Sequence, residues 1–381
     1  MAEGTITKFE TDDGVRWRVR VDMVDSEGRR LRPQRTYKTR REAQVGLTQW
    51  RAEIERGMGV VPSGKSVGDY LQFWLDTSAR YRVRASTLAS YRDKVRLYIR
   101  PTLGNVPLQK LSPAQVQSLY GDLLAGYRGR AAVSPRTVRY VHAILHRALK
   151  EAVGLGLVPR NVTDAVSPPK AMRPPIKSWD VPDVQRFLAV AAPDGYSPLW
   201  LIALHTGMRR GELLGLRWRD VDLAKGVLRV QQILSTVKEG ERFTPPKTAS
   251  GRRTIALDGP SIAALKDHRI RQKERRLALG AVWQDYDLVF TSDIGTPLDH
   301  GNVYHRFVAL VKTAGVPRIS FHGLRHTHAT LLMKHGVHPK VASERLGHAD
   351  ITLTLQTYSH VLPQMQQEAA SIFAAAVAAP S

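Results

Sequence analysis

The most informative absence in this sequence is cysteine. None of the 381 residues is a cysteine, which excludes disulfides, cysteine-ligated zinc, iron–sulfur clusters and thiol nucleophiles. Acidic residues are also few, because 34 Asp and Glu stand against 57 Lys and Arg, a formal net charge of +23. No run of about 18 apolar residues occurs, and no basic–apolar–small leader opens the chain. We therefore expect a soluble, cytoplasmic protein whose partner is a nucleic acid rather than a membrane.

The chain does contain enough apolar sequence for folded domains. Its hydrophobic content is 43%, and 381 residues exceed one ordinary domain. Pattern and charge divide it into three parts. Residues 1–62 carry 13 basic and 10 acidic side chains, residues 63–176 carry 18 and 6, and residues 177–381 carry 26 and 18. The middle part is the most basic and is therefore the best candidate for binding phosphates.

The first part is predicted to be a small sheet followed by a helix. "GVRWRVRVDM" alternates, so one strand face is apolar and the other carries three arginines, Arg16, Arg18 and Arg20. "RPQRTYKT" predicts a further strand, and Thr39 with Glu42 matches a capping box opening a helix to about Arg56. An arginine-lined strand face suits a DNA groove. From composition alone, a solvated sheet face is an equal alternative.

The second part is predicted to be helical. Ser66 opens "SVGDYLQFWLDTSA", and a second helix starts at Ser86 and ends at Pro101. Two later helices open at Ser112-Pro113 and Ser134-Pro135. Six basic side chains decorate these helices: Arg92, Lys94, Arg96, Arg136, Arg139 and Arg147. Such charges usually form a solvated face, but the scarcity of acids in this part favours contact with the DNA backbone.

Prolines gather between the second and third parts. Five lie between residues 159 and 177: Pro159, Pro168, Pro169, Pro174 and Pro175. They indicate a stiff, extended linker. We predict a helical domain over residues 63–165, a linker over residues 166–176 and a third domain over residues 177–381.

The third part begins with an arginine at a helix start. In "LHTGMRRGELLGLRWRDVD", Gly207 ends one helix and Arg209 begins the next. Glu212 lies three residues later on the same face, where it can hold the guanidinium. A clamped arginine near a helix N-terminus suits phosphate binding. On spacing alone, an ordinary surface ion pair is the commoner outcome.

Three further stretches carry candidate polar groups. "FTPPKTASGRRTIAL" predicts a β-hairpin with Lys247 near its tip, where the lysine is either solvated or able to protonate a leaving oxygen. "SFHGLRHTHATLLMKHG" places His322 and Arg325 on one helix face as donors for phosphate. "RLGHADITLTLQTYSH" ends a helix at Gly347, presents His348 from the turn and resumes a helix before Tyr358.

Zinc binding is an alternative role for the histidines of "SFHGLRHTHATLLMKHG". His322, His326 and His328 have no acid or cysteine among them, and an arginine lies within the group. Zinc is therefore disfavoured. His326 and His328 are expected to pack or cap.

Taken in order, "TGMRRGE", "PPKT", "HGLRH", "LGH" and "TY" form a specific set. The set resembles the tyrosine recombinases, and among them the lambda-type phage integrases. The resemblance covers most of the chain and implies a multidomain α+β fold. Residues 1–62 would be a small N-terminal domain, a three-stranded sheet plus a helix, that binds arm-type DNA sites. Residues 63–165 would be a helical, SAM-like core-binding domain, and residues 177–381 a mainly α catalytic domain with a small β-hairpin or sheet.

The resemblance also implies an active site. Six positions match the family's catalytic residues: Arg209, Lys247, His322, Arg325, His348 and Tyr358. Glu212 matches the family's supporting acid. Tyr358 would be the nucleophile that forms a 3′-phosphotyrosyl link, with His322 as base and Lys247 as acid for the leaving 5′-hydroxyl. His348 would hydrogen-bond the phosphate.

This residue set suits phosphodiester chemistry without a metal. A phosphodiester is already anionic, so a catalyst must neutralise the charge that develops on its non-bridging oxygens. Arginine is permanently charged and binds two phosphate oxygens at once, so two arginines can replace a metal ion. The sequence has no obvious carboxylate cluster for a metal. We expect neither metal nor cofactor.

The implied partner is double-stranded DNA at core-type and arm-type attachment (att) sites, bound by a homotetramer. A host DNA-bending protein and an excision factor are further expected partners. The expected role is integration of a phage or mobile element into a bacterial chromosome, in the cytoplasm and at the nucleoid. The last stretch, "PQMQQEAASIFAAAVAAP", predicts an apolar helix with Ile372, Phe373 and Val377. It either packs on its own core or, as the family implies, docks on a neighbouring protomer.

Three other functions compete with recombination. A type IB topoisomerase uses the same chemistry alone, but the arm-type first part and the apolar tail argue against it. A catalytically silent DNA-binding regulator needs neither Lys247 nor Tyr358. A metal-dependent nuclease is disfavoured for want of clustered carboxylates.

Overall fold

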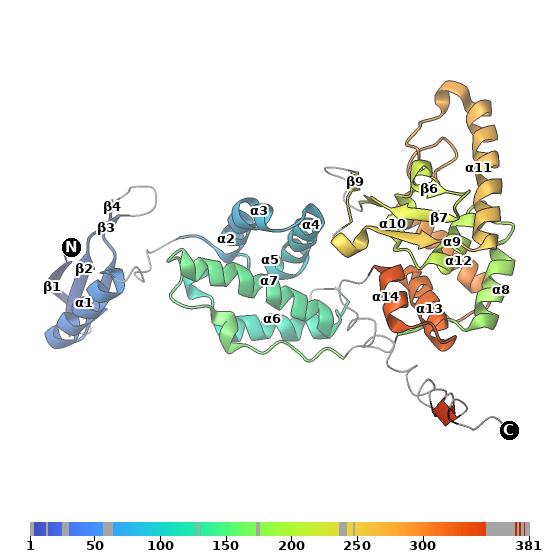
Figure 1. Cartoon of the computed structure of the whole chain (residues 1–381). Helices are drawn as coiled ribbons and strands as arrows, with labels where there is room; N and C mark the ends of the chain where they lie inside the picture. The colour runs from blue at the N-terminus through green and yellow to red at the C-terminus, as the bar shows by residue number, and fades with distance from the viewer. Residues whose placement is uncertain are drawn as a thin grey trace. The chain divides into compact units, whose positions relative to one another are not determined.

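The structure is a computed structural model (Figure 1). It describes residues 4–12, 14–24, 30–55, 64–126, 129, 131–172, 176–235, 242–246, 248–347, 370–371, 373–374 and 377. The chain forms two compact units, Met1–Arg173 and Pro174–Ser381. Each has its own apolar cores, and each is described by itself.

The N-terminal part of the first unit is the predicted sheet with a helix on it. Strands β1 (Gly4–Thr11), β2 (Gly14–Val21) and β5 (Gln34–Tyr37) form an antiparallel sheet in the order β1-β2-β5. A two-stranded ribbon, β3 (Met23–Val24) with β4 (Arg30–Leu31), lies between β2 and β5 in sequence. Helix α1 (Arg40–Glu55) packs on the sheet, and its buried Ala43, Leu47 and Trp50 meet Val19 and Val21 of β2.

The capping box predicted for α1 is present. The Thr39 hydroxyl accepts from the Glu42 backbone N–H at 3.2 Å, and the Glu42 carboxylate accepts from the Thr39 backbone N–H at 3.2 Å. The two bonds satisfy backbone donors that a helix start leaves without partners. This fixes the helix start where the sequence predicts it.

The rest of the first unit is helical. Its elements are α2 (Val67–Trp74), a π-helical turn (Leu75–Ala79), α3 (Arg80–Arg82), α4 (Ala85–Lys94), a second π-helical turn (Val95–Ile99), α5 (Arg100–Leu103), α6 (Pro113–Ala125) and α7 (Pro135–Gly154), with 3₁₀ turns at Leu108–Lys110 and Val162–Ala165. Ser66, Ser112 and Ser134 are N-caps, as predicted. The core includes Tyr70 and Trp74 of α2 and Ile144 and Leu145 of α7.

Two predictions for this part are wrong. The second helix begins at Ala85 with Arg84 as N-cap, and it does not end at Pro101. The chain passes through the π-helical turn Val95–Ile99 and continues as α5, with Pro101 in the first turn of α5. A wider π turn shifts the hydrogen-bond ladder, and a proline near a helix start replaces an N–H that lacks a helical partner anyway.

The stretch after α7 is not extended from Pro159 onward. Residues 162–165 form the 3₁₀ turn, and Thr163 is 1% exposed and Val166 7% exposed. Val166 belongs to the apolar core of the helical part, and the Asn161 side chain accepts from the backbone N–H of Thr163 at 3.1 Å where the turn begins. The linker boundary at residue 166 stays a prediction.

The second unit is mainly helical around one large core. Its helices are α8 (Val181–Ala191), α9 (Ser197–Thr206), α10 (Arg210–Leu214), α11 (Gly259–Leu279), α12 (His300–Thr313), α13 (Phe321–Lys334) and α14 (Pro339–Leu346), with short 3₁₀ turns at Trp218–Asp220, Ala249–Gly251 and Gly280–Val282. Aromatic rings fill the centre of the core: Trp179, Phe187, Trp200, Phe307 and Phe321. Helices α13 and α14 lie side by side (Figure 1).

Two small sheets accompany these helices. Strands β6 (Val221–Asp222), β7 (Val227–Val230) and β10 (Arg253–Ala256) form one sheet in the order β10-β7-β6. Strand β8 (Ile233–Leu234) pairs with β9 (Phe243–Thr244) in the other. The hairpin predicted in "FTPPKTASGRRTIAL" is therefore wrong, because its two arms pair in different sheets. Pro245 and Pro246 follow β9 and have no N–H for a ladder, so the pairing stops there.

Only part of the predicted apolar tail lies among the described residues. Residues 370–371, 373–374 and 377 are helical, with Phe373 71% exposed and Val377 65% exposed. Ile372 lies outside them.

Candidate active site

The junction of α9 and α10 presents Arg209. Helix α9 ends at Gly207, whose φ of 63° is left-handed, the conformation that glycine adopts at least cost. A Cβ on Gly207 would lie 2.8 Å from the His328 ring and 2.8 Å from the Leu346 side chain. Arg209 then serves as the N-cap of α10, as predicted.

Glu212 holds Arg209 from within the protein. The Glu212 carboxylate accepts from the Arg209 backbone N–H at 3.0 Å and from Arg209 Nη1 at 2.7 Å. Glu212 is 2% exposed, whereas the Arg209 side chain is 40% exposed. The commoner outcome expected from spacing, a surface ion pair, is thus wrong, because the carboxylate is buried and only the guanidinium reaches solvent.

A second arginine, Arg253 of β10, shares the same carboxylate. Its Nη2 donates to Glu212 Oε2 at 2.9 Å, and its side chain is 6% exposed. Burial acts to raise the pKa of Glu212, but the Arg253 hydrogen bond and the Arg253 and Arg209 charges hold that pKa below its ordinary value. Glu212 is therefore an anion between two cations at neutral pH.

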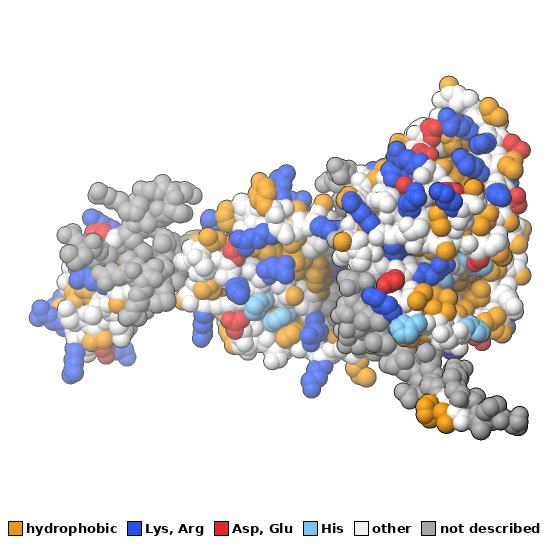
Figure 2. Space-filling model, in the orientation of Figure 1, with side chains coloured by type: hydrophobic (Ala, Val, Ile, Leu, Met, Phe, Trp, Pro, Cys, Tyr) orange, Lys and Arg blue, Asp and Glu red, His pale blue; other side chains and the backbone are white. Residues whose placement is uncertain are grey.

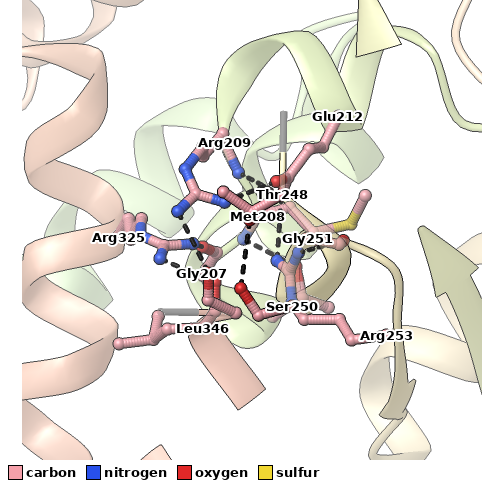
Figure 3. A network of polar contacts seen from close by, with 12 residues as sticks. Gly207, Met208, Arg209, Glu212, Thr248, Ser250, Gly251, Arg253, Arg325 and Leu346 are labelled. Atoms are coloured by element: carbon pink, nitrogen blue, oxygen red, sulfur yellow. Dashed lines mark hydrogen bonds and ion pairs between the residues drawn. The ribbon is translucent and has the colours of Figure 1, made fainter. Parts of the chain in front are cut away.

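The C-terminal end of α14 is bound by three arginines. Three consecutive carbonyls accept hydrogen bonds: Arg345 O from Arg253 Nε at 2.7 Å, Leu346 O from Arg325 Nη2 at 2.7 Å, and Gly347 O from Arg209 Nη2 at 3.3 Å. Figure 3 shows the guanidinium groups of Arg209, Arg253 and Arg325 converging here from three elements. A helix C-terminus is a favourable place for cations, since its free carbonyls carry partial negative charge.

Arg325 lies beneath this network on α13. It is 2% exposed, and its Nη1 also donates to Gly207 O at 2.9 Å. The side chain thus ties the end of α9 to the end of α14. The structure brings Arg325, Arg209 and Glu212 together, as the prediction requires.

His322 lies one turn before Arg325 and remains exposed to solvent in the free chain. Partial desolvation, the neighbouring His326, and the charges of Arg325 and Arg209 lower the pKa of His322 to about 4. A neutral imidazole at pH 7 can accept a proton. His326 packs edge to face against His322, with ring centroids 4.9 Å apart.

His328 is part of the packing, as predicted. It is 8% exposed, and its Nε2 accepts from Arg345 Nε at 3.1 Å. A nitrogen that accepts from a guanidinium is not free to bind zinc. Within the described ranges, no group of three His, Cys, Asp or Glu side chains could hold a metal ion.

Three predicted residues lie outside the described residues: Lys247, His348 and Tyr358. Their neighbours are described. Pro246 and Thr248 flank Lys247, and Gly347, which directly precedes His348, is part of the arginine network.

Two arginines of the network were missed from the sequence. Arg253 and Arg345 join α14 to β10 and α9, and Arg345 Nη2 donates to His205 O at 2.9 Å. A signal for Arg253 was available, since Ile255 faces the core and a residue two positions earlier on a strand shares its face. An arginine at a core-facing strand position indicates a buried partner.

The three arginines of β2 form the sheet face that points away from α1. Their partners on β1 are Phe9, Thr7 and Thr5, for Arg16, Arg18 and Arg20 respectively. The Arg18 guanidinium lies 4.1 Å from the centre of the Phe9 ring, and Arg20 Nε donates to Gln34 at 3.4 Å. The face is mostly polar and partly exposed, which leaves both DNA contact and simple solvation open.

The six basic residues of the helical part differ in setting. Arg136, Arg139 and Arg147 are exposed on one stripe of α7, and Arg147 also donates to the Tyr91 hydroxyl at 2.7 Å. Arg92 pairs with Asp76 at 2.9 Å and Arg96 with Asp93 at 3.0 Å. Lys94 is half-buried, 5.1 Å from the Tyr98 ring. Figure 2 shows Lys and Arg side chains on the visible face of this part, with only a few acids among them.

The described residues include no helix that is both long and apolar enough to cross a membrane.

Comparison with known proteins places these features in a family. Residues 183–365 match the Phage integrase family, and residues 66–124 match the phage integrase N-terminal SAM-like domain. A tyrosine recombinase XerC-like protein of Caldanaerobacter subterraneus is 29% identical over 91% of this chain and 92% of its own length. An integrase of Streptomyces ambofaciens is 29% identical over 90% of this chain and 89% of its own length.

Solved structures share the fold. The Tn1549 transposon integrase in complex with transposon right end DNA has a TM-score of 0.63 at 22% identity, over 79% of this chain and 99% of its own. A lambda integrase dimer bound to a core site has a TM-score of 0.56 at 19% identity, over 92% of this chain and 94% of its own. Family match, relatives and fold agree with the arginine and histidine motifs, and the chain belongs to the phage integrase family of tyrosine recombinases.

Proposed function

We propose that this chain acts as a site-specific integrase in which Tyr358 attacks a DNA phosphodiester and becomes joined to the 3′ phosphate. The new bond links the Tyr358 oxygen to phosphorus, the bond to the 5′ oxygen breaks, and that oxygen leaves with a proton. The link keeps the energy of the broken bond, so the strand can be rejoined to a new partner without ATP. Integration of a phage or mobile element at att sites follows from two such exchanges.

The observation that carries the proposal is a network in which Arg209 and Arg253 share one buried carboxylate, while Arg325 binds carbonyls at the ends of α9 and α14. Arg209 is 40% exposed and is oriented by Glu212, so it can contact the non-bridging oxygens of a phosphate. Arg325 is 2% exposed and contributes its charge from beneath, where a low dielectric strengthens it. Both cations stabilise the charge that grows on the phosphate as Tyr358 attacks.

The remaining roles follow from the acid–base needs of the step. A phenol has a pKa of about 10, so its ionisation at pH 7 costs roughly 4 kcal/mol. We assign His322 as the base, because the exposed ring lies one turn from Arg325 and is neutral at pH 7, with a nitrogen lone pair for the proton. Lys247 protonates the leaving 5′ oxygen, and His348 hydrogen-bonds the phosphate.

We assign the other parts of the chain to DNA binding and assembly. Residues 63–165 bind the core site through the α7 stripe, residues 166–176 link, residues 177–381 cleave, and residues 1–62 bind arm-type sites through the arginine face of β2. Four copies assemble on two sites. The exposed Phe373 and Val377 offer apolar surface for contact between copies. The further proposed partners are a host DNA-bending protein and an excision factor. The proposed location of the protein is the bacterial cytoplasm, at the nucleoid.

The test uses a nicked half-site that traps the covalent intermediate, in a buffer with a metal chelator. The full chain should give a protein–DNA band that survives denaturant and carries label from the 3′-phosphate side of the cut. Tyr358→Phe should abolish the band. Tyr286→Phe is the matched control, since Tyr286 lies on the surface of the same unit and is 38% exposed. A band that persists in Tyr358→Phe, or that needs magnesium, refutes the assignment.

A further inference from the structure

We propose that Arg253 is a positioning residue for strand cleavage: it fixes Glu212, and through Glu212 the guanidinium of Arg209, while holding the end of α14. This inference rests on the proposed function and adds a residue outside the six that match the family's active site. Arg253 does not itself meet the phosphate, because its side chain is 6% exposed and its donors point inward.

Each hydrogen bond described for Arg253 goes to a group that shapes the site. Nη2 donates to Glu212 Oε2 at 2.9 Å, Nε donates to Arg345 O at 2.7 Å, and Nη1 donates to Gly251 O at 3.2 Å. The guanidinium therefore joins α10, α14 and the turn that opens β10. The planar fork of arginine makes three bonds in fixed directions, which lysine cannot reproduce.

Glu212 passes this constraint to Arg209. One carboxylate oxygen, Oε2, accepts from both Arg253 Nη2 and the Arg209 backbone, while the other, Oε1, accepts from Arg209 Nη1. Because Arg253 holds Oε2, the carboxylate cannot rotate and Oε1 keeps one orientation. The hydrogen bond to Oε1 then fixes the position of the half-exposed Arg209 guanidinium. Loss of Arg253 frees the carboxylate to rotate and lets Arg209 take other rotamers.

The same side chain contacts the residue that leads to His348. Gly347 has a φ of 67°, and a Cβ there would lie 2.9 Å from Arg253 Cδ and 2.7 Å from Ser250 O. The chain therefore leaves α14 in direct contact with the Arg253 stem. Arg253 also stands six positions after Lys247 in the sequence, and its Nη1 donates to Gly251 O within the turn between them.

A purely structural role predicts the same contacts, so the test measures the chemistry. The variants are Arg253→Met, Arg253→Lys and Arg252→Met. Arg252 is the adjacent arginine and is exposed, which makes it the matched control. Single-turnover cleavage of the nicked half-site is measured beside half-site affinity. We expect Arg253→Met to cleave about 10–100-fold more slowly with affinity nearly unchanged, by analogy with the loss of groups that orient metal ligands. Arg253→Lys should fall between, and Arg252→Met should match the wild type.

A neutral substrate identifies the group through which Arg253 acts. In a methylphosphonate half-site a methyl group replaces one non-bridging oxygen, so the reacting centre has no charge for Arg209 to neutralise. The deficit of Arg253→Met should then shrink severalfold. An equal deficit on the phosphate and the methylphosphonate overturns the proposal. Restoration by a 5′-thio leaving group, which needs no acid, would assign the effect to the Lys247 segment instead and also overturns it.

A pH profile gives an independent readout. Without Arg253, burial of Glu212 is opposed by fewer cations, so the acid limb of the cleavage rate should move to higher pH in Arg253→Met. An unmoved limb counts against the proposal. If Arg253→Met does not fold, as judged by its urea transition, Arg253→Lys carries the same three measurements.

Failure of this inference is distinguishable from failure of the proposed function. The latter fails when the wild type forms no covalent band or when Tyr358→Phe still forms one. This inference alone fails when the wild type forms the band and Arg253→Met forms it at the same rate.

Discussion

Glu212→Gln tests the energetic weight of the buried carboxylate. Glutamine has nearly the same shape, so the change removes the charge and replaces one acceptor oxygen by an amide donor. Glu212 accepts three hydrogen bonds, from Arg209 N at 3.0 Å, Arg209 Nη1 at 2.7 Å and Arg253 Nη2 at 2.9 Å. A glutamine can keep some of them but must face another donor with its own NH₂ group.

The expected cost follows from burial. Arg253 is 6% exposed and Glu212 is 2% exposed, so the variant leaves a buried guanidinium without its counter-charge. Removing one partner of a buried pair costs about 3–5 kcal/mol. Loss of the ion pair with Arg209 adds little to this cost, because the Arg209 side chain is 40% exposed and screened by water. With a urea slope of ~3 kcal/mol per M, the midpoint should fall by about 1 M or more.

The assay is urea unfolding of the full chain, followed by tryptophan fluorescence. Trp179 and Trp200 are 1% and 0% exposed in the same unit as Glu212 and report its unfolding. Glu344→Gln is the matched control, since Glu344 pairs with Lys340 at 3.4 Å and is 66% exposed. Its cost should be at most about 0.5 kcal/mol.

A double variant separates charge from shape. On the Glu212→Gln background, Arg253→Met removes the uncompensated cation, so much of the lost stability should return. Additive losses in the double variant, or equal midpoint shifts in Glu212→Gln and Glu344→Gln, would show that the buried pair does not govern the stability of this unit.

Three further outcomes are expected. Burial and the Arg345 charge lower the pKa of His328 to about 3. Since unfolded histidine titrates near 6.5, stability should fall as pH drops from about 6.5 toward 3, less so in His328→Asn, by urea midpoints at pH 7 and 5. Gly347→Ala should be more destabilising and cleave more slowly than Gly336→Ala, because both are left-handed but a Cβ on Gly336 meets nothing within 4 Å. If Arg139 contacts a phosphate, Arg139→Gln should reduce the log–log salt slope of DNA binding by about 0.9, whereas Lys225→Gln should not.

The local rules of the sequence predicted element starts best. Ser66, Ser112 and Ser134 cap helices, and Gly207 and Gly347 end them, because these effects depend on a few neighbouring residues. Pro101 shows the limit. A proline normally ends a helix, but the π-helical turn before it depends on how the whole segment packs, which sequence spacing does not reveal.

Strand pairing was the weaker part of the prediction. "FTPPKTASGRRTIAL" has two strand-like arms and a turn, and both strands exist. Their partners, β8 and β7, lie earlier in the sequence, and nothing local distinguishes these pairings from a hairpin. The role of Arg253 is equally hard to predict from local sequence, because its partner Glu212 is 41 residues away.

The electrostatics of the site explain why so few acids suffice. Arg209 and Arg253 share the Glu212 carboxylate, so charge pairing alone leaves an excess of positive charge, and Arg325 binds the same helix end through backbone carbonyls. The remaining compensation comes from backbone carbonyls at the ends of α9 and α14, which accept hydrogen bonds from all three guanidiniums. Carbonyl dipoles hold cations in place without cancelling their net charge. The cluster therefore keeps a positive field at the half-exposed Arg209, which an additional glutamate or aspartate would cancel. The negative charge of a bound phosphate then neutralises the excess positive charge of the arginines.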